Sequence, residues 1–357
     1  MGWTVQPLRA DDETFWSGWQ RLADSRTIRH PCLEADFVRA AVRRFGPAGD
    51  RLHAARHGDD AFVVLDRAGA GRWTTFRVPV LSIAPVLLQE GDAARRAPLT
   101  TLFAALGPLA WTWRLYDVDP HYHPVPGSPA DERVCRLTKH TTVSIDTVGN
   151  FAAYWGARSK KLRGRISGAL RKAQAQGPVT LLCQRDVGAM RDAVATHARL
   201  EVSGWKGANG SAMKPEDAYG TFYREVMEAF AARGEARAYQ LQVGERLIAS
   251  QLCTVSGGTL VTMKTAYLDE AASLSPGRLL DHLMMAELFA DPRVDRVEFV
   301  IQASSSDLVW ATSHRELLQL DVLRARPLAD VLRLKRRLVR RAAAADAGAD
   351  TATVNAP

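Results

Sequence analysis

The chain has few cysteines and no long apolar run, and both absences limit what the protein can be. Its 357 residues contain four cysteines, at positions 32, 135, 183 and 253, whose scattered spacing matches no zinc-ligand pattern. No stretch of 18 or more apolar residues occurs, so no membrane-spanning helix is expected. The N-terminus, Met1–Val5, lacks a basic segment followed by an apolar one, so no secretory signal is predicted. These features predict a cytoplasmic protein with reduced thiols and no bound metal.

Acidic residues are absent from one long segment of the chain. No Asp or Glu occurs between Asp146 and Asp186, and the net charge of the whole chain is +8. Such a positive field attracts phosphates, whether in coenzyme A, nucleotide sugars, tRNA or anionic lipid. A solvated helix face is the alternative explanation. The basic residues of this segment include Arg158, Lys160, Lys161, Arg163, Arg165, Arg171 and Lys172.

Alternating helix and strand patterns divide the chain into two halves, 1–136 and 137–326, joined near Leu137–Asn150. The length suits two α/β domains with cores of ordinary size. In the first half we expect helices at 12–24, 33–45 and 99–106, and strands at 61–66, 72–80 and 111–117. In the second half we expect strands at 141–145, 178–184, 237–243, 247–255, 259–267 and 294–301, and helices at 151–176, 187–201, 218–233 and 279–289.

The most informative pattern is the step from the strand Thr259–Tyr267 to the helix Leu279–Phe289. The polar loop between them, 268–278, ends in Ser275-Pro276-Gly277. Proline suits the first turn of a helix, and glycine lets a ligand approach the backbone closely. Free N–H groups at a helix N-terminus bind phosphate or pyrophosphate. The loop therefore predicts a phosphate site that includes Ser273, Ser275, Gly277 and Arg278.

Several segments, in order, resemble the GNAT N-acyltransferases, in the branch of the Fem-like and cellulose-biosynthesis-associated acetyltransferases. The resemblance spans about residues 10–325, and its order and spacing carry more weight than any single motif. The matching segments are Phe151–Trp155 followed by Ser159–Arg165, Ser203–Gly207 (Ser-Gly-Trp-Lys-Gly), Arg246–Leu252, Tyr267 with its loop, and Ser275–Gly277.

This resemblance implies a tandem GNAT-like α/β fold, with mixed central sheets flanked by helices, and acyl transfer from acyl-CoA to an amine. The acyl-CoA would contact Lys264, Ser273, Ser275, Gly277 and Arg278. The acceptor would contact Trp205, Lys206 and Tyr223. A backbone N–H near Met263–Thr265 would stabilise the oxyanion of the thioester. Tyr267 would return a proton to the thiolate, while Glu298 and Asp307 are the candidate acids that accept the amine proton.

Each of these roles has a structural alternative. Tyr267 is also explained as an aromatic at the edge of the core, Glu298 as an ion-pair partner at a strand end, and Trp205 as a plug between the halves. His121-Tyr122-His123 resembles a metal site, but no second ligand pair supports it, and a loop is favoured. Cys253 lies in an expected buried strand, where an inert thiol is favoured over a nucleophile.

The chain departs from the family at one position of functional interest. Relatives carry Tyr-Lys three residues before a tryptophan, which is Trp310 here. At that position this chain has Ser306-Asp307. Three function classes follow. The first is an acyl-CoA-dependent transferase acting on a small metabolite, amino sugar or biosynthetic intermediate. The second is an aminoacyl-tRNA-dependent Fem-like transferase, and the third a non-catalytic assembly protein for polysaccharide production.

The C-terminal segment has a composition of its own. Residues 327–342 are expected to form a basic amphipathic helix. One face would carry Leu328, Val331, Leu332, Lys335, Leu338 and Val339, and the others Arg333, Arg336, Arg337, Arg340 and Arg341. Such a helix either packs its leucines on its own domain or rests on an anionic membrane surface as a peripheral contact. Residues 343–357 are small and polar and predict a disordered tail.

Overall fold

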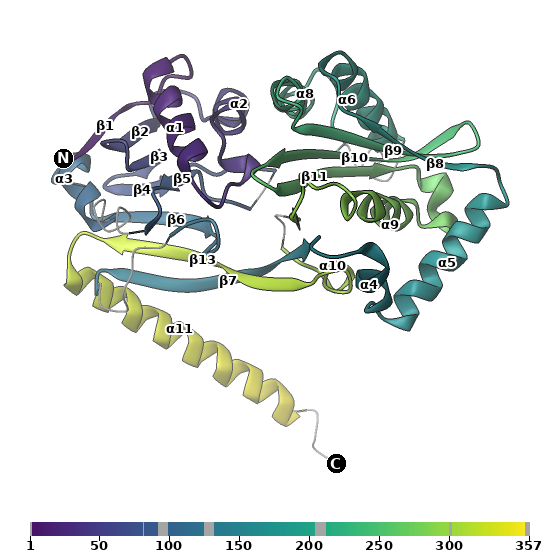
Figure 1. Ribbon diagram of the computed structural model, residues 1–357. Coiled ribbons are helices and arrows are strands. Elements are labelled where there is room, and N and C mark those ends of the chain that lie inside the picture. The colour runs from purple at the N-terminus through teal and green to yellow at the C-terminus, as the bar shows by residue number, and fades with distance from the viewer. Residues whose placement is uncertain are drawn as a thin grey trace.

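The computed structural model describes residues 2–80, 82–91, 99–124, 132–203, 212–299 and 302–353, with side chains described through Val339 in the last helix. The chain folds as a single 13-stranded mixed sheet with helices on both faces (Figure 1). The path of the sheet runs β1-β2-β3-β4-β6-β13-β7-β12-β11-β10-β9-β8, and β5 pairs with β3. The expected tandem α/β fold is confirmed, and the two sheets are joined into one.

The first half of the chain supplies one end of the sheet and three helices. Its strands are β1 (Trp3–Pro7), β2 (Leu52–His57), β3 (Ala61–Gly69), β4 (Arg72–Thr75), β5 (Val86–Leu88), β6 (Thr112–Val118) and β7 (Val134–Asp146), and its helical elements are α1 (Glu13–Ser25), η1 (Pro31–Leu33), α2 (Ala35–Phe45), η3 (Leu99–Leu102) and α3 (Phe103–Leu106).

The second half supplies the other end of the sheet and most of the helices. Its strands are β8 (Val179–Gln184), β9 (Ala236–Val243), β10 (Arg246–Ser256), β11 (Thr259–Tyr267), β12 (Arg296–Glu298) and β13 (Ser313–Leu323), and its helical elements are α4 (Phe151–Gly156), α5 (Lys160–Gln174), α6 (Val187–Val202), α8 (Ala218–Ala231), η4 (Asp269–Leu274), α9 (Pro276–Leu288), α10 (Ser305–Leu308) and α11 (Arg326–Thr353).

The two halves exchange strands at the middle of the sheet. β7, which leaves the first half, pairs antiparallel with β12 of the second half. β13, which leaves the second half, returns to pair antiparallel with β6 of the first. β7 and β13 also pair with each other, from Ser313 opposite Ser144 to Val322 opposite Val134. The expected boundary at residues 136 and 137 therefore falls inside β7, and each half is completed by a strand from the other.

Each half contains one short parallel contact beside its exchanged strand. β4 and β6 pair in parallel only from Arg72 to Thr74, and β11 and β12 only from Thr259 to Val261. β12 ends with its last pair, at Glu298, and β4 ends one residue beyond its own, at Thr75. In the second half the 13-residue helix α9 follows β11, whereas the helix α3 of the first half has four residues.

The hydrophobic core is continuous across the seam between the halves. α1 and α2 of the first half pack with α6 and α8 of the second around Phe37, Phe222 and Phe230, which are fully buried. Phe37 and Phe222 meet edge to face with ring centroids 5.3 Å apart. On the opposite face of the second half, α4, α5 and α9 cover β8 to β12. Across the described residues, no helix has the length and apolar character needed to cross a bilayer.

Several local predictions need correction. The expected helix 151–176 is two helices, because Ser159 caps α5 by accepting a hydrogen bond from the backbone N–H of Leu162 at 3.2 Å. The strands β1, β2, β5 and β13 were not expected, and β7 begins at Val134 rather than at residue 141. The last helix continues to Thr353, into the segment expected to be disordered, because alanine favours helix.

Glu298 is the last residue of β12. Its side chain is fully buried and accepts a hydrogen bond from the Tyr122 hydroxyl at 2.8 Å. Arg315 of β13 pairs with Glu298 at 2.8 Å and with Asp119 at 2.6 Å. Burial raises the pKa of Glu298, and Arg315 opposes the shift. This cluster, Glu298 with Arg315, Asp119 and Tyr122, joins both halves under the seam.

We expect Arg315→Ala to lower the free energy of unfolding by about 3–5 kcal/mol, because it leaves buried carboxylates without their cation. The raised pKa of Glu298 means that stability from its protonated form is present below the ordinary value of 4.5 and is lost as pH rises above it. The loss in Arg315→Ala should therefore be larger at about pH 8 than at about pH 5 in urea unfolding. Adding Glu298→Gln should restore part of it, and a loss independent of pH would contradict this account.

Candidate active site

The site lies where β11 continues beyond its last pairing with β12. β11 carries a bulge there: Leu252 of β10 lies opposite Lys264 and Cys253 opposite Thr262, so Met263 has no partner on β10. A bulge leaves the extra residue outside the regular ladder and redirects the neighbouring side chains. Thr262–Thr265, the stretch around this bulge, line a cavity, and the sequence predicted an oxyanion contact there.

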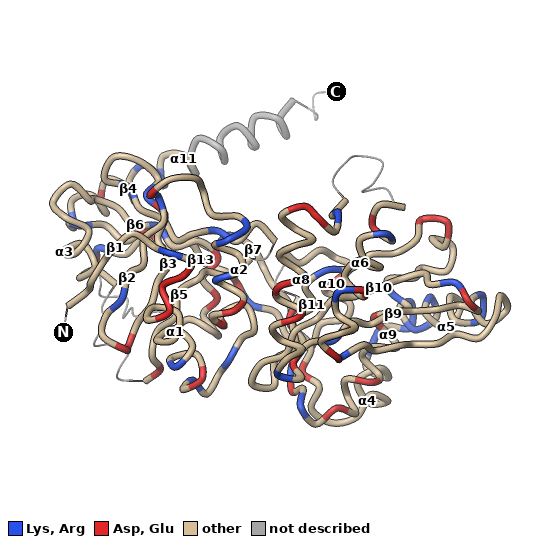
Figure 2. Tube along the Cα trace, turned by 90° about the horizontal axis from the view of Figure 1, so that it is seen from above, with Lys and Arg blue, Asp and Glu red and all other residues tan. Residues whose placement is uncertain are grey.

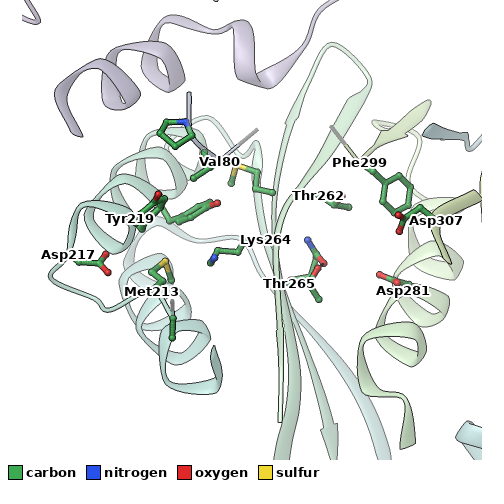
Figure 3. Close-up of a pocket in the computed structure, with 15 residues that line it drawn as sticks. Val80, Met213, Asp217, Tyr219, Thr262, Lys264, Thr265, Asp281, Phe299 and Asp307 are labelled. Atoms are coloured by element: carbon green, nitrogen blue, oxygen red, sulfur yellow. Dashed lines mark hydrogen bonds between the residues drawn. The ribbon is translucent and has the colours of Figure 1, made fainter. Parts of the chain in front are cut away.

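A cavity of about 710 Å³ opens at this bulge. Figure 3 shows that its side chains come from both sides of β11, with Tyr219 and Lys264 toward α6 and α8, and Asp281 and Phe299 toward α9. Pro79 and Val80 of the first half also line it, so the cavity lies at the seam. The full lining is Pro79, Val80, Ala212, Met213, Asp217, Tyr219, Tyr223, Gln251, Thr262, Met263, Lys264, Thr265, Asp281, Phe299 and Asp307.

The side of this cavity near α6 and α8 is fixed by a buried ion pair. Lys264 Nζ lies 3.0 Å from Glu201 Oε1, and Glu201 Oε2 accepts a hydrogen bond from the backbone N–H of Met213 at 3.0 Å. Lys264 also lies 5.7 Å from the ring centre of Tyr223, which is buried. Burial raises the pKa of the Tyr223 hydroxyl, so this phenol stays protonated. Lys264 thus lines the wall of this cavity, whereas Ser273 lines another.

Two carboxyl groups occupy the opposite side of the cavity. Asp281 of α9 and Asp307 of α10 line both this cavity and a second cavity of about 340 Å³ next to it. Burial and the neighbouring charge of Asp307 raise the pKa of Asp281 to about 7, while Arg278 opposes the shift. Asp307 accepts hydrogen bonds from the backbone N–H of Ser304 at 2.8 Å and from its hydroxyl at 2.6 Å, which hold it in place.

The second cavity leads from this carboxyl pair to the N-terminus of α9. Tyr267, Gly277 and Trp310 line it. Tyr267, at the end of β11, is 37% exposed and borders this cavity. The backbone of Trp310 is held in place, because its carbonyl accepts hydrogen bonds from the Tyr154 hydroxyl at 2.7 Å and from Arg158 at 3.0 Å.

A third cavity, of about 500 Å³, lies between the N-terminus of α9 and the basic helix α5. Ser273, Ser275 and Arg278 line one wall, and Arg165 and Lys172 line the other. Ser275 has φ 49° and ψ 55°, the left-handed conformation that is unfavourable for a residue with a side chain. α9 begins immediately afterwards without a side-chain cap, so its first N–H groups remain available for an anion.

The structure thus groups the predicted residues differently from the sequence. Ser273, Ser275, Gly277 and Arg278 gather around the start of α9, and Lys264 and Tyr223 meet in the main cavity. Tyr267 and Asp307 lie together in the second cavity. Glu298 is fully buried in the Arg315 cluster and lines none of these three cavities. Trp205 and Lys206 lie outside the described residues, but Ala212 and Met213, which follow that segment, line the main cavity.

Sequence reasoning missed Asp281 and Asp217. Asp281 is an acid within the otherwise apolar start of a helix, Leu279-Leu280-Asp281-His282-Leu283, and that was its available signal. Asp217 caps α8, accepting a hydrogen bond from the backbone N–H of Gly220 at 2.7 Å, while it also lines the main cavity. His123, considered above as a metal ligand, is buried with its ring nitrogens near backbone groups of Asp119 and Ala84. Cys253, considered as a nucleophile, is buried, and burial raises the pKa of its thiol well above the usual value.

Part of the chain matches a known protein family. The model of the acetyltransferase (GNAT) domain matches residues 160–306, which include α5, the bulged strand β11, α9 and β12. This match covers all three cavities except for Pro79, Val80, Asp307 and Trp310. Residues 160–306 are therefore similar to a GNAT acetyltransferase domain, and this similarity supports a transferase.

Particular solved structures share the fold over nearly the whole chain. FemX is 11% identical, with a TM-score of 0.58, over 92% of this chain and 99% of that one. The C-terminal DUF2156 domain of an Agrobacterium fabrum protein assigned as a lysylphosphatidylglycerol synthetase is 11% identical, with a TM-score of 0.57, over 91% and 96%. L-PGS from Bacillus licheniformis is 11% identical, with a TM-score of 0.50, over 93% and 98%. At these identities the similarity establishes the fold. No curated protein matches the chain.

We expect Asp281→Asn to change the pH dependence of stability. Because the pKa of Asp281 is raised from 3.8 to about 7, the folded state favours its protonated form, and this contribution to stability is complete below pH 3.8 and is lost as pH rises through 7. The amide cannot ionise. The unfolding free energy of the variant relative to wild type should therefore be about 2 kcal/mol higher at about pH 8 than at about pH 5.

Urea unfolding at both pH values measures this gain. Asp269→Asn, at an exposed acid in η4, is the matched control and should show no such change. Asp307→Asn should reduce the effect, because it removes the charge that raises the pKa of Asp281. An equal gain at both pH values would show that Asp281 is already ionised near pH 5.

Proposed function

We propose that the protein is an acyl-CoA-dependent N-acyltransferase that acylates an amine of a small metabolite, amino sugar or biosynthetic intermediate. The observation that carries this proposal is the continuity of the three cavities along α9. The third cavity, which we call the phosphate-side cavity, shares Ser275 and Arg278 with the second cavity. The second cavity shares Asp281, Phe299 and Asp307 with the main cavity of about 710 Å³. An extended donor with phosphates at one end and a thioester at the other fits this order.

The phosphate end of the donor would lie between α9 and α5. Arg278, Arg165 and Lys172 supply positive charge there, and the first N–H groups of α9 supply hydrogen-bond donors. Gly277 keeps the approach open on the side of the second cavity. The rest of the donor would then follow the second cavity past Tyr267 and Trp310 toward the bulge of β11.

The chemistry requires one base, one acid and an oxyanion donor. The acceptor amine attacks the thioester carbonyl carbon, an N–C bond forms, and the C–S bond breaks. Asp281, with its pKa near 7, takes the proton that the amine nitrogen loses. The backbone N–H groups at the Met263 bulge stabilise the negative charge on the carbonyl oxygen. Tyr267 returns a proton to the leaving thiolate.

The acceptor would occupy the main cavity, between Lys264 and the carboxyl pair. Its volume of about 710 Å³ accommodates a small molecule rather than a folded protein. Asp307 stands where relatives carry the lysine of their Tyr-Lys pair. In this proposal the pair Asp281 and Asp307 replaces that cation with a proton acceptor, so loss of the motif does not remove activity. Lys206 and Trp205 remain predicted acceptor contacts, and the cytoplasm remains the predicted location.

Gly277→Asp tests the donor site. Its carboxylate would lie beside the donor phosphates, and like charges in contact cost several kcal/mol, so acyl-CoA affinity should fall about a hundredfold or more. The fold should persist, because an acid in the first turn of a helix is favourable. Isothermal titration with acetyl-CoA and a longer acyl-CoA measures the change.

Gly277→Ala is the matched control for this test. Its added Cβ would lie 3.6 Å from Tyr267 Cδ1, an ordinary contact, so affinity should change little. Unchanged acyl-CoA binding by a folded Gly277→Asp variant would contradict the donor site. Loss of binding in both variants would indicate closure of the backbone approach rather than charge repulsion.

One observation favours a second donor class, aminoacyl-tRNA. Lys160, Lys161, Arg165, Arg171 and Lys172 are exposed along α5. Lys and Arg gather along this helix in Figure 2. Arg158, by contrast, donates hydrogen bonds to the backbone carbonyls of Trp310 and Ala311. An exposed row of cations attracts the phosphates of RNA as well as those of a nucleotide.

Filter binding with charged and uncharged tRNA at about 50 and 200 mM salt separates the two donors. We expect weak binding with no preference for the aminoacylated form, because no aromatic platform for bases accompanies the described face of α5. Lys160→Glu/Lys161→Glu should then leave acyl-CoA affinity nearly unchanged, since neither residue lines the phosphate-side cavity. Tight binding that prefers aminoacylated tRNA and is lost in this variant would establish the second donor.

A further inference from the structure

α11 packs on the protein through one narrow face. Among the described residues its main contacts are with β7 and β13, and its buried residue Ala329 lies against Cys135 and Leu323, with Leu332 beside them. Arg333 donates hydrogen bonds to the backbone carbonyls of Glu132 and Val134, and Arg336 pairs with Asp321. Arg326 pairs with Glu132 at 2.8 Å. The described residues that hold this helix therefore include an alanine, a leucine and three arginines.

The larger apolar side chains of α11 point away from the protein. Val331 is 66% exposed, Leu334 58% and Leu338 56%. Their spacing of three and four residues places them along one line of the helix, opposite Ala329. Leu328 and Val339, at 38% and 60%, widen this line. The expectation that the helix packs its leucines on its own domain is therefore wrong for Val331, Leu334 and Leu338, which we call the outer stripe.

Positive charge borders the outer stripe. Lys335 lies on one side of it and Arg337 on the other, and both are exposed. Asp330 is the one acid among the described side chains of α11, and it pairs with Arg333 at 2.9 Å and Arg326 at 3.7 Å. Figure 1 shows α11 on the outer side of β7 and β13, away from α6, α8 and α9, so a flat surface can reach its length without meeting those helices.

From this arrangement we propose that α11 docks on an anionic lipid bilayer, with the outer stripe in the acyl–headgroup boundary and Lys335 and Arg337 at the anionic headgroups. An apolar line flanked by cations is complementary to such a surface in both polarity and charge. A second copy of this chain would bring the same cations against each other, so charge disfavours a paired α11. The proposal is independent of the donor and acceptor assigned above.

Flotation of the full chain with phosphatidylglycerol–phosphatidylcholine vesicles tests the docking. Wild type should bind these vesicles, bind pure phosphatidylcholine much less, and dissociate as salt rises. Val331→Gln/Leu334→Gln/Leu338→Gln keeps helix-forming residues but removes the apolar stripe, and should lower the bound fraction about tenfold or more. Lys335→Glu/Arg337→Glu should abolish the preference for anionic vesicles.

Matched variants elsewhere serve as controls. Leu109→Gln/Val148→Gln/Val187→Gln changes three side chains that are 84%, 80% and 46% exposed, and Arg43→Glu/Arg67→Glu changes two exposed cations of the first half. Both should bind vesicles like wild type. Absence of vesicle binding by wild type, or equal loss in the controls, would overturn the proposal. Sedimentation that shows a dimer lost only in the stripe variant would instead assign the stripe to a second copy.

Discussion

The buried pairing of Glu298 with Arg315 is the interaction on which the rest of the structure depends. Glu298 ends β12, Arg315 belongs to the returning strand β13, and Tyr122 and Asp119 come from the first half. A charge this deeply buried requires its counterion, so the cluster fixes how β12, β13 and the first half meet. β12 ends at Glu298, whereas β11 continues to Tyr267 beside β10, and the main cavity opens along that continuation.

The strand exchange then makes the two halves a single unit. β7 and β13 pair along most of their length and each completes the sheet of the opposite half. α1, α2, α6 and α8 share one core across the same seam. Among the described residues, the second half follows its parallel strand pair with the 13-residue helix α9, whereas α3 of the first half has four residues, and the cavities with site chemistry lie beside α9.

Much of the second half was predictable because its signals are local. The strand Thr259–Tyr267, the Ser275-Pro276-Gly277 step and the helix after it are set by alternation, by the fixed φ of proline and by the freedom of glycine. Tyr267 and Asp307 came instead from the resemblance to the GNAT acyltransferases and from their place near the expected cleft, and both stay predicted site residues. Asp281 was not predicted, because a single acid in an apolar helix shows no periodicity. The role of Glu298 was open in sequence, since burial and a partner nearby in space, not in sequence, decide it.

The sequence by itself determined the α/β class, the order of elements around the α9 loop, the basic character of α5 and the amphipathic character of the last helix, because each depends on neighbours within a few residues. Only the tertiary structure decided the exchange of β7 and β13, the meeting of Asp281 with Asp307, the partner of Lys264 and the outward direction of Val331, Leu334 and Leu338. Strand pairing and side-chain burial join residues far apart in the chain, and no local pattern records which residues will meet.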